Sequence, residues 1–129
     1  MRIEHIAIWT NELERLKDFY FSYFQAMVGK KYYNPGKQFE SYFLSFSNGA
    51  RLELMTAPDI QGRLGNSLNK LAGLTHISFS CGSRDQVDLL TERLRNDGYQ
   101  VLVEPHLTGD GYYESVVLDP DGNQIEITI

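Results

Sequence analysis

Cysteine is almost absent from this sequence: Cys81 is the only one among 129 residues. A single cysteine cannot form a disulfide within the chain, and its scarcity is typical of a protein that works in a reducing cytoplasm. Cys81 lies at the end of a predicted strand, and the sequence offers no partner that would activate it. We therefore expect an ordinary buried thiol and not a nucleophile.

The sequence also lacks an excess of basic residues and any long apolar run. It has 12 Lys and Arg against 17 Asp and Glu, a formal net charge of −5, and no basic stripe. This balance disfavours nonspecific binding to nucleic acid. No apolar run could span a bilayer, and the N-terminus lacks the layout of a signal peptide, so we expect a cytoplasmic protein with no membrane partner. The 42% of hydrophobic residues predict one compact globular domain.

One pattern occurs twice along the chain. The first copy begins with His5-Ile6-Ala7-Ile8 and ends in a strand that carries Glu53, and the second begins with His76-Ile77-Ser78-Phe79 and ends in a strand that carries Glu126. The histidine and the glutamate are separated by 53 − 5 = 48 positions in the first copy and by 126 − 76 = 50 in the second. A repeat of this kind indicates two similar modules that share one core.

Local signals predict the order β-α-β-β-β in each half of the chain. Alternation of apolar and polar residues, helical spacing and turn residues predict strands at 2–9, 39–47, 50–56, 74–81, 100–104, 112–119 and 123–129, a helix from the Asn11/Glu14 capping box to Gly29, and a helix from Ser83 to Gly98. We expect module one at 1–56, a connector at 57–72 with a short helical piece before Gly73, and module two at 73–129.

Strand alternation places the four repeated residues on the polar faces of their strands. On 51–55, Leu52 and Leu54 lie opposite Glu53, and on the last strand the isoleucines lie opposite Glu126. Taken singly, a glutamate on such a face is usually solvated, and a histidine near a strand start is usually structural or exposed. Four matching placements in two copies favour a shared metal site of two imidazoles and two carboxylates, if the two modules lie side by side.

These residues also give the chain a resemblance to the vicinal oxygen chelate superfamily, which includes glyoxalase I, bleomycin-resistance proteins and extradiol dioxygenases. The resemblance rests on the two histidine-led strands, Asp18-Phe19-Tyr20, Leu52-Glu53-Leu54, and the turn Asp119-Pro120-Asp121-Gly122 before Glu126. It implies an α+β fold in which two tandem βαβββ modules form an eight-stranded incomplete barrel. It also implies the metal ligands His5, Glu53, His76 and Glu126.

The resemblance to glyoxalase I implies a metal-dependent lyase or isomerase that acts on a small substrate with vicinal oxygens. Zinc or nickel is the expected ion, with cobalt or manganese as alternatives. Glu126 is the expected catalytic base, and Glu53 is a ligand or a partner base. Family members are commonly dimers, and the aromatic segment 19–24 is richer than one buried face requires, so we expect a homodimer.

Two departures concern the thiol of the substrate. Glyoxalase I enzymes usually carry an arginine four residues after the first ligand and an asparagine four residues after the first glutamate, and here these positions are Trp9 and Ala57. The substrate is therefore not necessarily bound to glutathione. Another metal enzyme of the same fold, such as an epimerase or dioxygenase, and a metal-free small-molecule binding protein remain the alternatives.

Overall fold

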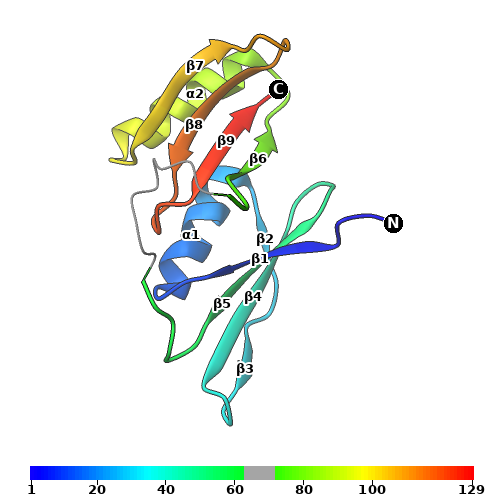
Figure 1. Cartoon of the computed structure of the whole chain (residues 1–129), viewed down its shortest axis with the longest axis vertical. Helices are drawn as coiled ribbons and strands as arrows, with labels where there is room; N and C mark the ends of the chain where they lie inside the picture. The colour runs from blue at the N-terminus through cyan, green and yellow to red at the C-terminus, as the bar shows by residue number, and fades with distance from the viewer. Residues whose placement is uncertain (63–71) are drawn as a thin grey trace. The chain divides into compact units, whose positions relative to one another are not determined.

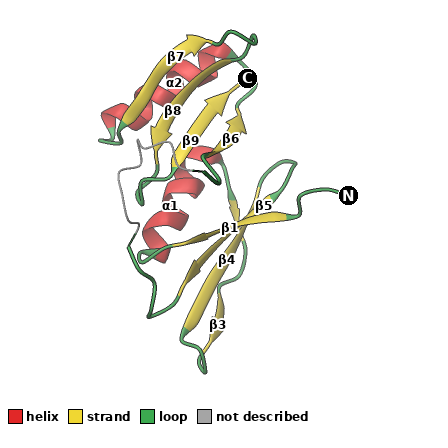
Figure 2. Cartoon of the chain, in the orientation of Figure 1, coloured by secondary structure: helices red, strands yellow, loops and turns green. Residues whose placement is uncertain are grey.

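The structure is a computed structural model that describes residues 1–62 and 72–129. The chain divides into two compact units, 1–64 and 65–129, and each contains one helix and one sheet (Figure 1; Figure 2). The predicted helical piece before Gly73 lies outside the described residues. Within the described ranges, no helix has the length and apolar character needed to cross a membrane.

Module one contains five strands, whereas the predicted order β-α-β-β-β has four and no range was predicted for the strand after the helix. Its elements are β1 (His5–Trp9), α1 (Leu13–Phe24), β2 (Met27–Val28), β3 (Tyr32–Asn34), β4 (Phe39–Ser45) and β5 (Arg51–Thr56). The strand order is β1-β5-β4-β2, and β3 also pairs with β4. Because β2 and β3 pair with different ends of the same edge of β4, they act as one interrupted strand. The predicted topology is therefore kept.

The predicted end of α1 at Gly29 is wrong. The helix ends at Phe24 because Gln25 adopts a left-handed conformation (φ 55°) that turns the chain, and its N–H bonds to the carbonyl of Tyr20. Gly29 instead donates a hydrogen bond of 2.9 Å to the carbonyl of Phe43. A Cβ at Gly29 would lie 3.0 Å from that oxygen. The glycine is needed for this close approach of two backbones and not for ending a helix.

The predicted capping box at the start of α1 is also wrong. The N-cap residue is Glu12, whose side chain makes no capping hydrogen bond, and its N–H donates to Thr10 Oγ1 at 3.0 Å. Glu14 does not reach back to Asn11 because its carboxylate accepts hydrogen bonds from Lys17, Lys31 and Tyr42. Lys17 contributes most to lowering the pKa of Glu14 to about 2. This charged network ties α1 to β4.

Module two repeats the arrangement. Its elements are β6 (His76–Ser80), α2 (Arg84–Asn96), β7 (Val101–Leu107), β8 (Tyr113–Leu118) and β9 (Gln124–Thr128). The sheet order is β6-β9-β8-β7. The predicted cap of α2 is confirmed, since the Ser83 side chain accepts a hydrogen bond from Gln86 N. Strand β7 runs through Pro105 and does not stop before it. A proline is tolerated there because β7 is an edge strand whose register shifts near that residue.

The apolar faces lie where strand alternation predicts them. Leu52 and Leu54 on β5 and Ile125 and Ile127 on β9 are each at most 3% exposed. Helix α1 contacts β5, β4 and β2, and α2 contacts β8, β7 and β9. Each helix therefore covers its own sheet. The glutamates on β5 and β9 are turned to the opposite face, away from the helix.

Glu126 is preceded by a turn organised by one buried carboxylate. Asp119, 4% exposed, accepts hydrogen bonds from the backbone N–H groups of Asp121 and Asn123 and from Asn123 Nδ2, at 2.8 to 3.0 Å. Gly122 supplies the positive φ of 80° that the turn requires. The turn thereby fixes where β9 begins.

We expect Asp119→Ala to lower the free energy of unfolding by about 2 to 3 kcal/mol, because three donors lose a charged acceptor in a buried place. Urea denaturation followed by circular dichroism measures the change. Asp110→Ala, at an exposed turn residue of the same module, is the matched control and should change stability by less than about 0.5 kcal/mol. Equal effects of the two substitutions would mean that Asp119 does not organise the turn.

Candidate functional site

The two histidine and glutamate pairs occupy the same position in their modules. In module one, β1 runs parallel to β5 and His5 lies beside Arg51, two residues before Glu53. In module two, β6 runs parallel to β9 and His76 lies beside Gln124, two residues before Glu126. Both pairs therefore have the same register, and in each pair the two side chains lie on one face of adjacent strands.

This register brings each imidazole to its carboxylate. His5 Nε2 lies 3.9 Å from Glu53 Oε2, and His76 Nε2 lies 3.5 Å from Glu126 Oε2. The side chains of the histidines are 41% and 42% exposed, and those of both glutamates are 16% exposed. Each module thus presents one partly exposed imidazole beside one largely buried carboxylate, two kinds of side chain that can bind divalent ions.

Three residues, Glu4, Arg51 and Phe43, fix the orientation of the His5 imidazole directly or through one another. One carboxylate oxygen of Glu4 accepts a hydrogen bond from His5 Nδ1, and the other accepts hydrogen bonds from Arg51. The bond to His5, followed by those from Arg51, lowers the pKa of Glu4. Phe43 meets the imidazole edge-on at 5.4 Å between ring centroids. A histidine whose Nδ1 is bonded to a carboxylate presents Nε2 to a metal, which is the usual arrangement around metal-bound imidazoles.

Arg51 is engaged within the module. Its guanidinium lies 4.1 Å from the ring centroid of Phe43, and it pairs with Glu4 at 2.5 Å. Its observed partners give it a supporting place behind His5.

The residue beside Glu126 on the neighbouring strand has a hydrogen-bonding side chain, whereas the residue beside Glu53 does not. Ser78 lies beside Glu126 in the β6–β9 register, and its hydroxyl donates a hydrogen bond of 2.6 Å to Glu126 Oε1. The corresponding neighbour of Glu53 is Ala7, which has no hydrogen-bonding side chain. The two carboxylates are therefore equivalent in backbone position but not in surroundings. One oxygen of Glu126 faces His76 and the other is held by Ser78.

Each module brings together one pair of these donors. Over residues 1–62 and 72–129, no three His, Cys, Asp or Glu residues gather closely enough to hold an ion. His5 meets Glu53 and His76 meets Glu126. The joining of the two pairs at one ion stays a prediction.

Glu114 is a neighbour of this site that the sequence reasoning missed. It lies on β8, paired with His106 on one side and with Thr128 on the other. Burial, followed by the negative charge of Glu126, raises the pKa of Glu114. The alternation along 113–118 placed it on the same face as Glu126, and that signal could have found it. His106 lies in β7, which continues past residue 104, where the predicted strand ended.

Cys81 is a partly buried thiol after β6. It hydrogen bonds to the carbonyl of Thr128 at 3.3 Å, and burial raises its pKa. A raised pKa keeps the sulfur protonated at neutral pH, which is the opposite of what a nucleophile needs. This surrounding supports the expectation that Cys81 has no catalytic role.

Cys81 should therefore react slowly with iodoacetamide at pH 7.5, at a rate several-fold below that of free cysteine. The rate should go on rising with pH above the range in which an ordinary thiol ionises, because only the thiolate attacks. Mass spectrometry of the intact protein measures the labelling. Labelling at neutral pH as fast as that of free cysteine would contradict the assignment of Cys81 as an unreactive thiol.

Solved structures share this fold at low sequence identity. The chain matches glyoxalase I from Zea mays with a TM-score of 0.80 and 21% identity, over 98% of this chain and 44% of that one. It matches a glyoxalase family protein from Enterococcus faecalis with a TM-score of 0.78 and 22% identity, over 99% and 97%. The trypanothione-dependent glyoxalase I of Leishmania major matches at 0.76 and 23%, over 98% and 85%. These likenesses confirm the predicted fold class.

A relative and a family model were found by sequence. The uncharacterized protein YqjT of Bacillus subtilis (strain 168) is 41% identical over 58 residues, which are 43% of this chain and 45% of that protein. The matched part thus spans less than half of that relative. The model of the Glyoxalase/Bleomycin resistance protein/Dioxygenase superfamily matches residues 2–127. Since this match covers nearly the whole sequence, the chain belongs to that superfamily.

Proposed function

We propose that the protein is a divalent-metal-dependent lyase or isomerase of the glyoxalase I kind. Its substrate would be a small molecule with two neighbouring oxygen atoms. The observation that carries this proposal is the pair of half-sites, in which His5 with Glu53 and His76 with Glu126 have the same strand register, similar distances and matching exposure. A duplicated arrangement of this kind has no evident use in packing, since the helices cover the opposite faces.

The donors fit a divalent ion. Two imidazole nitrogens and two carboxylate oxygens suit zinc, nickel, cobalt or manganese, and four protein ligands leave positions open in an octahedral site. The bond from Glu4 to His5 Nδ1 supports the fit because it leaves Nε2 as the ligand atom. A bound ion of this kind would stabilise negative charge that develops on the two substrate oxygens.

The two glutamates have different parts in this proposal. Glu126 moves a proton between neighbouring carbons of the substrate, and Ser78 positions it by holding Oε1 while Oε2 stays on the side of His76. Glu53, beside Ala7, is a ligand or a partner base. The first pair, with Glu4 and Phe43 behind His5, forms the more rigidly supported half of the site.

The two alternative functions differ from this proposal in measurable ways. A dioxygenase would use iron with three protein ligands, so one of the two glutamates would not be needed for metal binding. A binding protein of the same superfamily would hold its ligand without any ion. Four donors in two matched pairs support an enzyme with a four-ligand site. A homodimer and a cytoplasmic location are part of the proposal.

We expect the purified protein to bind one zinc or nickel ion per chain, since two half-sites are needed for each ion. His5→Ala and His76→Ala should each lower the affinity at least tenfold, because either change leaves too few ligands. Isothermal titration calorimetry measures both stoichiometry and affinity, and analytical ultracentrifugation gives the number of chains in the assembly. His106→Ala is the matched control and should bind as the unaltered protein does.

Two ions per chain, with one lost on substitution of either histidine, would show that each pair binds separately. That result would contradict the shared site. The absence of binding to any divalent ion would leave the metal-free binding protein as the function.

We expect Glu126→Gln to lower turnover at least a hundredfold, because an amide cannot accept the substrate proton. The assay uses metal-loaded protein with methylglyoxal and several thiols, and follows thioester formation by absorbance. Ser78→Ala should lower kcat by a smaller factor with little change in KM, as a positioning residue would. Circular dichroism checks that each variant is folded.

Glu104→Gln is the matched control for this series. It makes the same chemical change on the exposed part of β7, where Glu104 pairs with Arg95. It should leave turnover unchanged. If Glu126→Gln retains the rate of this control on a true substrate, then Glu126 is not the base.

A further inference from the structure

Module one contains a cavity at the end of β1, where Trp9 lies two residues beyond Ala7, the neighbour of Glu53 in the strand register. It has a volume of about 590 Å³ and is lined by side chains from β1, β3, β4 and the segment after β5. Trp9, its wall from β1, lies on the same face as His5 and four residues further along the strand. At about 3.3 Å per residue, the two Cα atoms are about 13 Å apart. We call this space the Trp9 cavity.

Three aromatic rings form the apolar wall of the Trp9 cavity. Phe39 is the central ring, since its centroid lies 6.0 Å from that of Trp9 and 6.1 Å from that of Tyr32. The planes of Trp9 and Tyr32 are inclined to the plane of Phe39 by 85° and 60°, so the three rings are not stacked on one another. Yet Trp9 is 53% and Tyr32 54% exposed. Large aromatic side chains that line a cavity and stay exposed are typical of a binding site.

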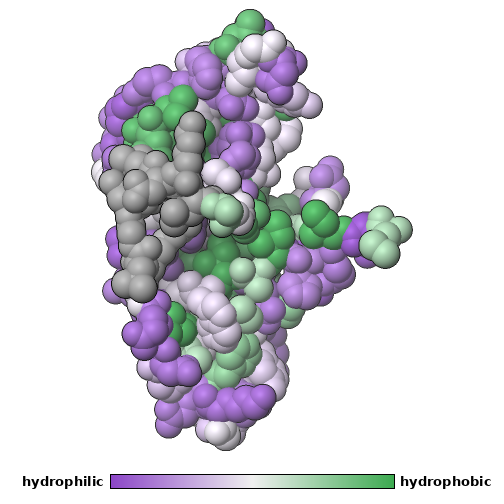
Figure 3. Space-filling view, viewed as in Figure 1, coloured by the Kyte–Doolittle hydropathy of each residue, from purple (hydrophilic) through white to green (hydrophobic). Residues whose placement is uncertain are grey.

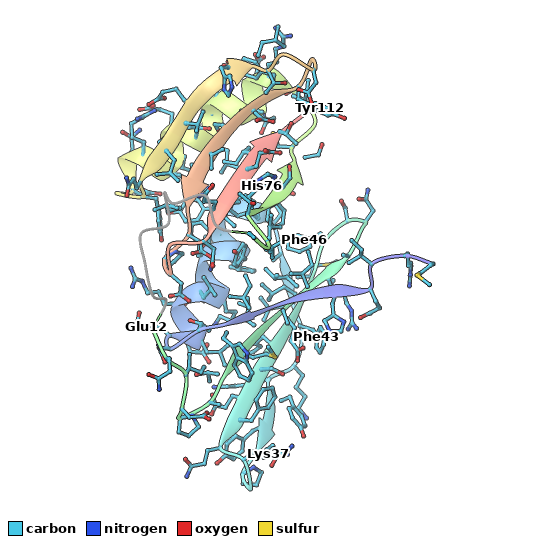
Figure 4. All side chains as sticks on the ribbon, viewed as in Figure 1. Glu12, Lys37, Phe43, Phe46, His76 and Tyr112 are labelled. Carbon is cyan, nitrogen blue, oxygen red and sulfur yellow. The ribbon has the colours of Figure 1, made fainter. Side chains whose placement is uncertain are left out.

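The polar part of the wall has no net charge. Lys37 and Asp59 both line the cavity and carry opposite charges. Lys37 lies in the tight turn between β3 and β4, where its N–H donates a hydrogen bond of 3.2 Å to Asn34 Oδ1. Figure 4 shows it at the tip of the β3–β4 turn, away from Phe43 in the middle of β4, and this tip is hydrophilic in Figure 3. A ligand with a full charge would be attracted by one of these residues and repelled by the other.

We propose that the Trp9 cavity binds a flat, uncharged ring at the distal end of the substrate, the part that the reaction leaves unchanged. The ring packs against Trp9, Phe39 and Tyr32, and its polar substituents hydrogen bond to Lys37 and Asp59. That this ring belongs to the substrate of the metal site rests on the proposed function. The binding of the ring itself does not.

The lining of the cavity differs from the one that the resemblance to glyoxalase I led us to expect for a peptide thiol. Trp9 and Ala57 occupy the two positions at which the resemblance to glyoxalase I led us to expect an arginine and an asparagine, and both line the cavity. A tryptophan ring offers one uncharged indole N–H and a methyl group offers no donor, whereas a guanidinium is charged and binds a carboxylate through two parallel hydrogen bonds. They do enlarge the apolar surface that a ring can cover. The inferred substrate is therefore the adduct of a ring-bearing carrier.

The cavity contains its own reporter, because Trp9 is the only tryptophan of the chain. The probe is 4-nitrobenzyl alcohol, a flat neutral ring whose nitro group quenches tryptophan emission on contact. The full-length protein is titrated in the presence of EDTA, so that no divalent ion contributes. We expect saturable quenching, whereas random collisions would give a linear dependence on concentration.

Tyr32→Leu and Tyr33→Leu form a matched pair of variants. Both tyrosines lie on β3 and both are 54% exposed, but only Tyr32 lines the cavity. Tyr32→Leu should raise the dissociation constant of the probe about fivefold to tenfold, since one ring contact is lost. Tyr33→Leu should leave it unchanged. Phe39→Leu, at the central ring, should act like Tyr32→Leu, with circular dichroism to show that the variants are folded.

Linear quenching, or an equal loss in the Tyr32 and Tyr33 variants, would overturn the assignment of the cavity. A second arm tests its link to the metal site by comparing methylglyoxal adducts of benzyl mercaptan and of 2-mercaptoethanol. The ring-bearing adduct should have a kcat/KM about tenfold higher, and Tyr32→Leu should remove that advantage. Equal kcat/KM values for the two adducts would overturn this link. Saturable binding without any metal binding would leave the cavity in place and refute only the proposed function.

Discussion

The parallel pairing between the first and last strands of each module is the constraint on which the candidate site depends. A parallel pair fixes the register of two strands that are far apart in sequence, and side-chain alternation then decides which residues share a face. A shift of one residue between β1 and β5 would turn Glu53 toward α1 and leave His5 alone. The buried Leu52 and Leu54 prevent this shift because it would expose both of them. Burial of the leucines on one face of β5 thus fixes the position of Glu53 on the other face.

Much of this arrangement could be predicted from the sequence, because it depends on alternation. The faces of β5 and β9, the cap at Ser83 and the turn before β9 all follow local rules that operate over a few residues. The errors occur where distant residues decide. Helix α1 ends at Phe24 because the chain must return to pair with β4, and Gly29 is needed for its approach to Phe43. Glu14 does not cap the helix because Lys31 and Tyr42, far along the chain, bind its carboxylate.

The supporting residues of the site were harder to predict for a similar reason. Glu4, Arg51 and Phe43 come from three segments and meet only behind His5. No spacing rule links them. Ser78 was visible on the face of His76, but its bond to Glu126 depends on the register of β6 against β9. The repeat in the sequence therefore indicates two equal half-sites, whereas the side chains around them make the halves unequal.

This inequality has a chemical meaning. Divergence of the two copies allows one half to hold its histidine firmly, through Glu4 and Phe43, while the other gives its carboxylate a hydroxyl partner. A carboxylate with one oxygen bonded to a hydroxyl keeps its other oxygen in a defined direction, here toward His76. Strand β1 also separates two roles along its length, since its two ends belong to the candidate metal site and to the Trp9 cavity. Its start carries His5 and its end carries Trp9, so substitutions in the Trp9 cavity can leave the register of the proposed metal ligands unchanged. A scaffold of this kind can exchange one substrate for another by altering residues at the strand ends.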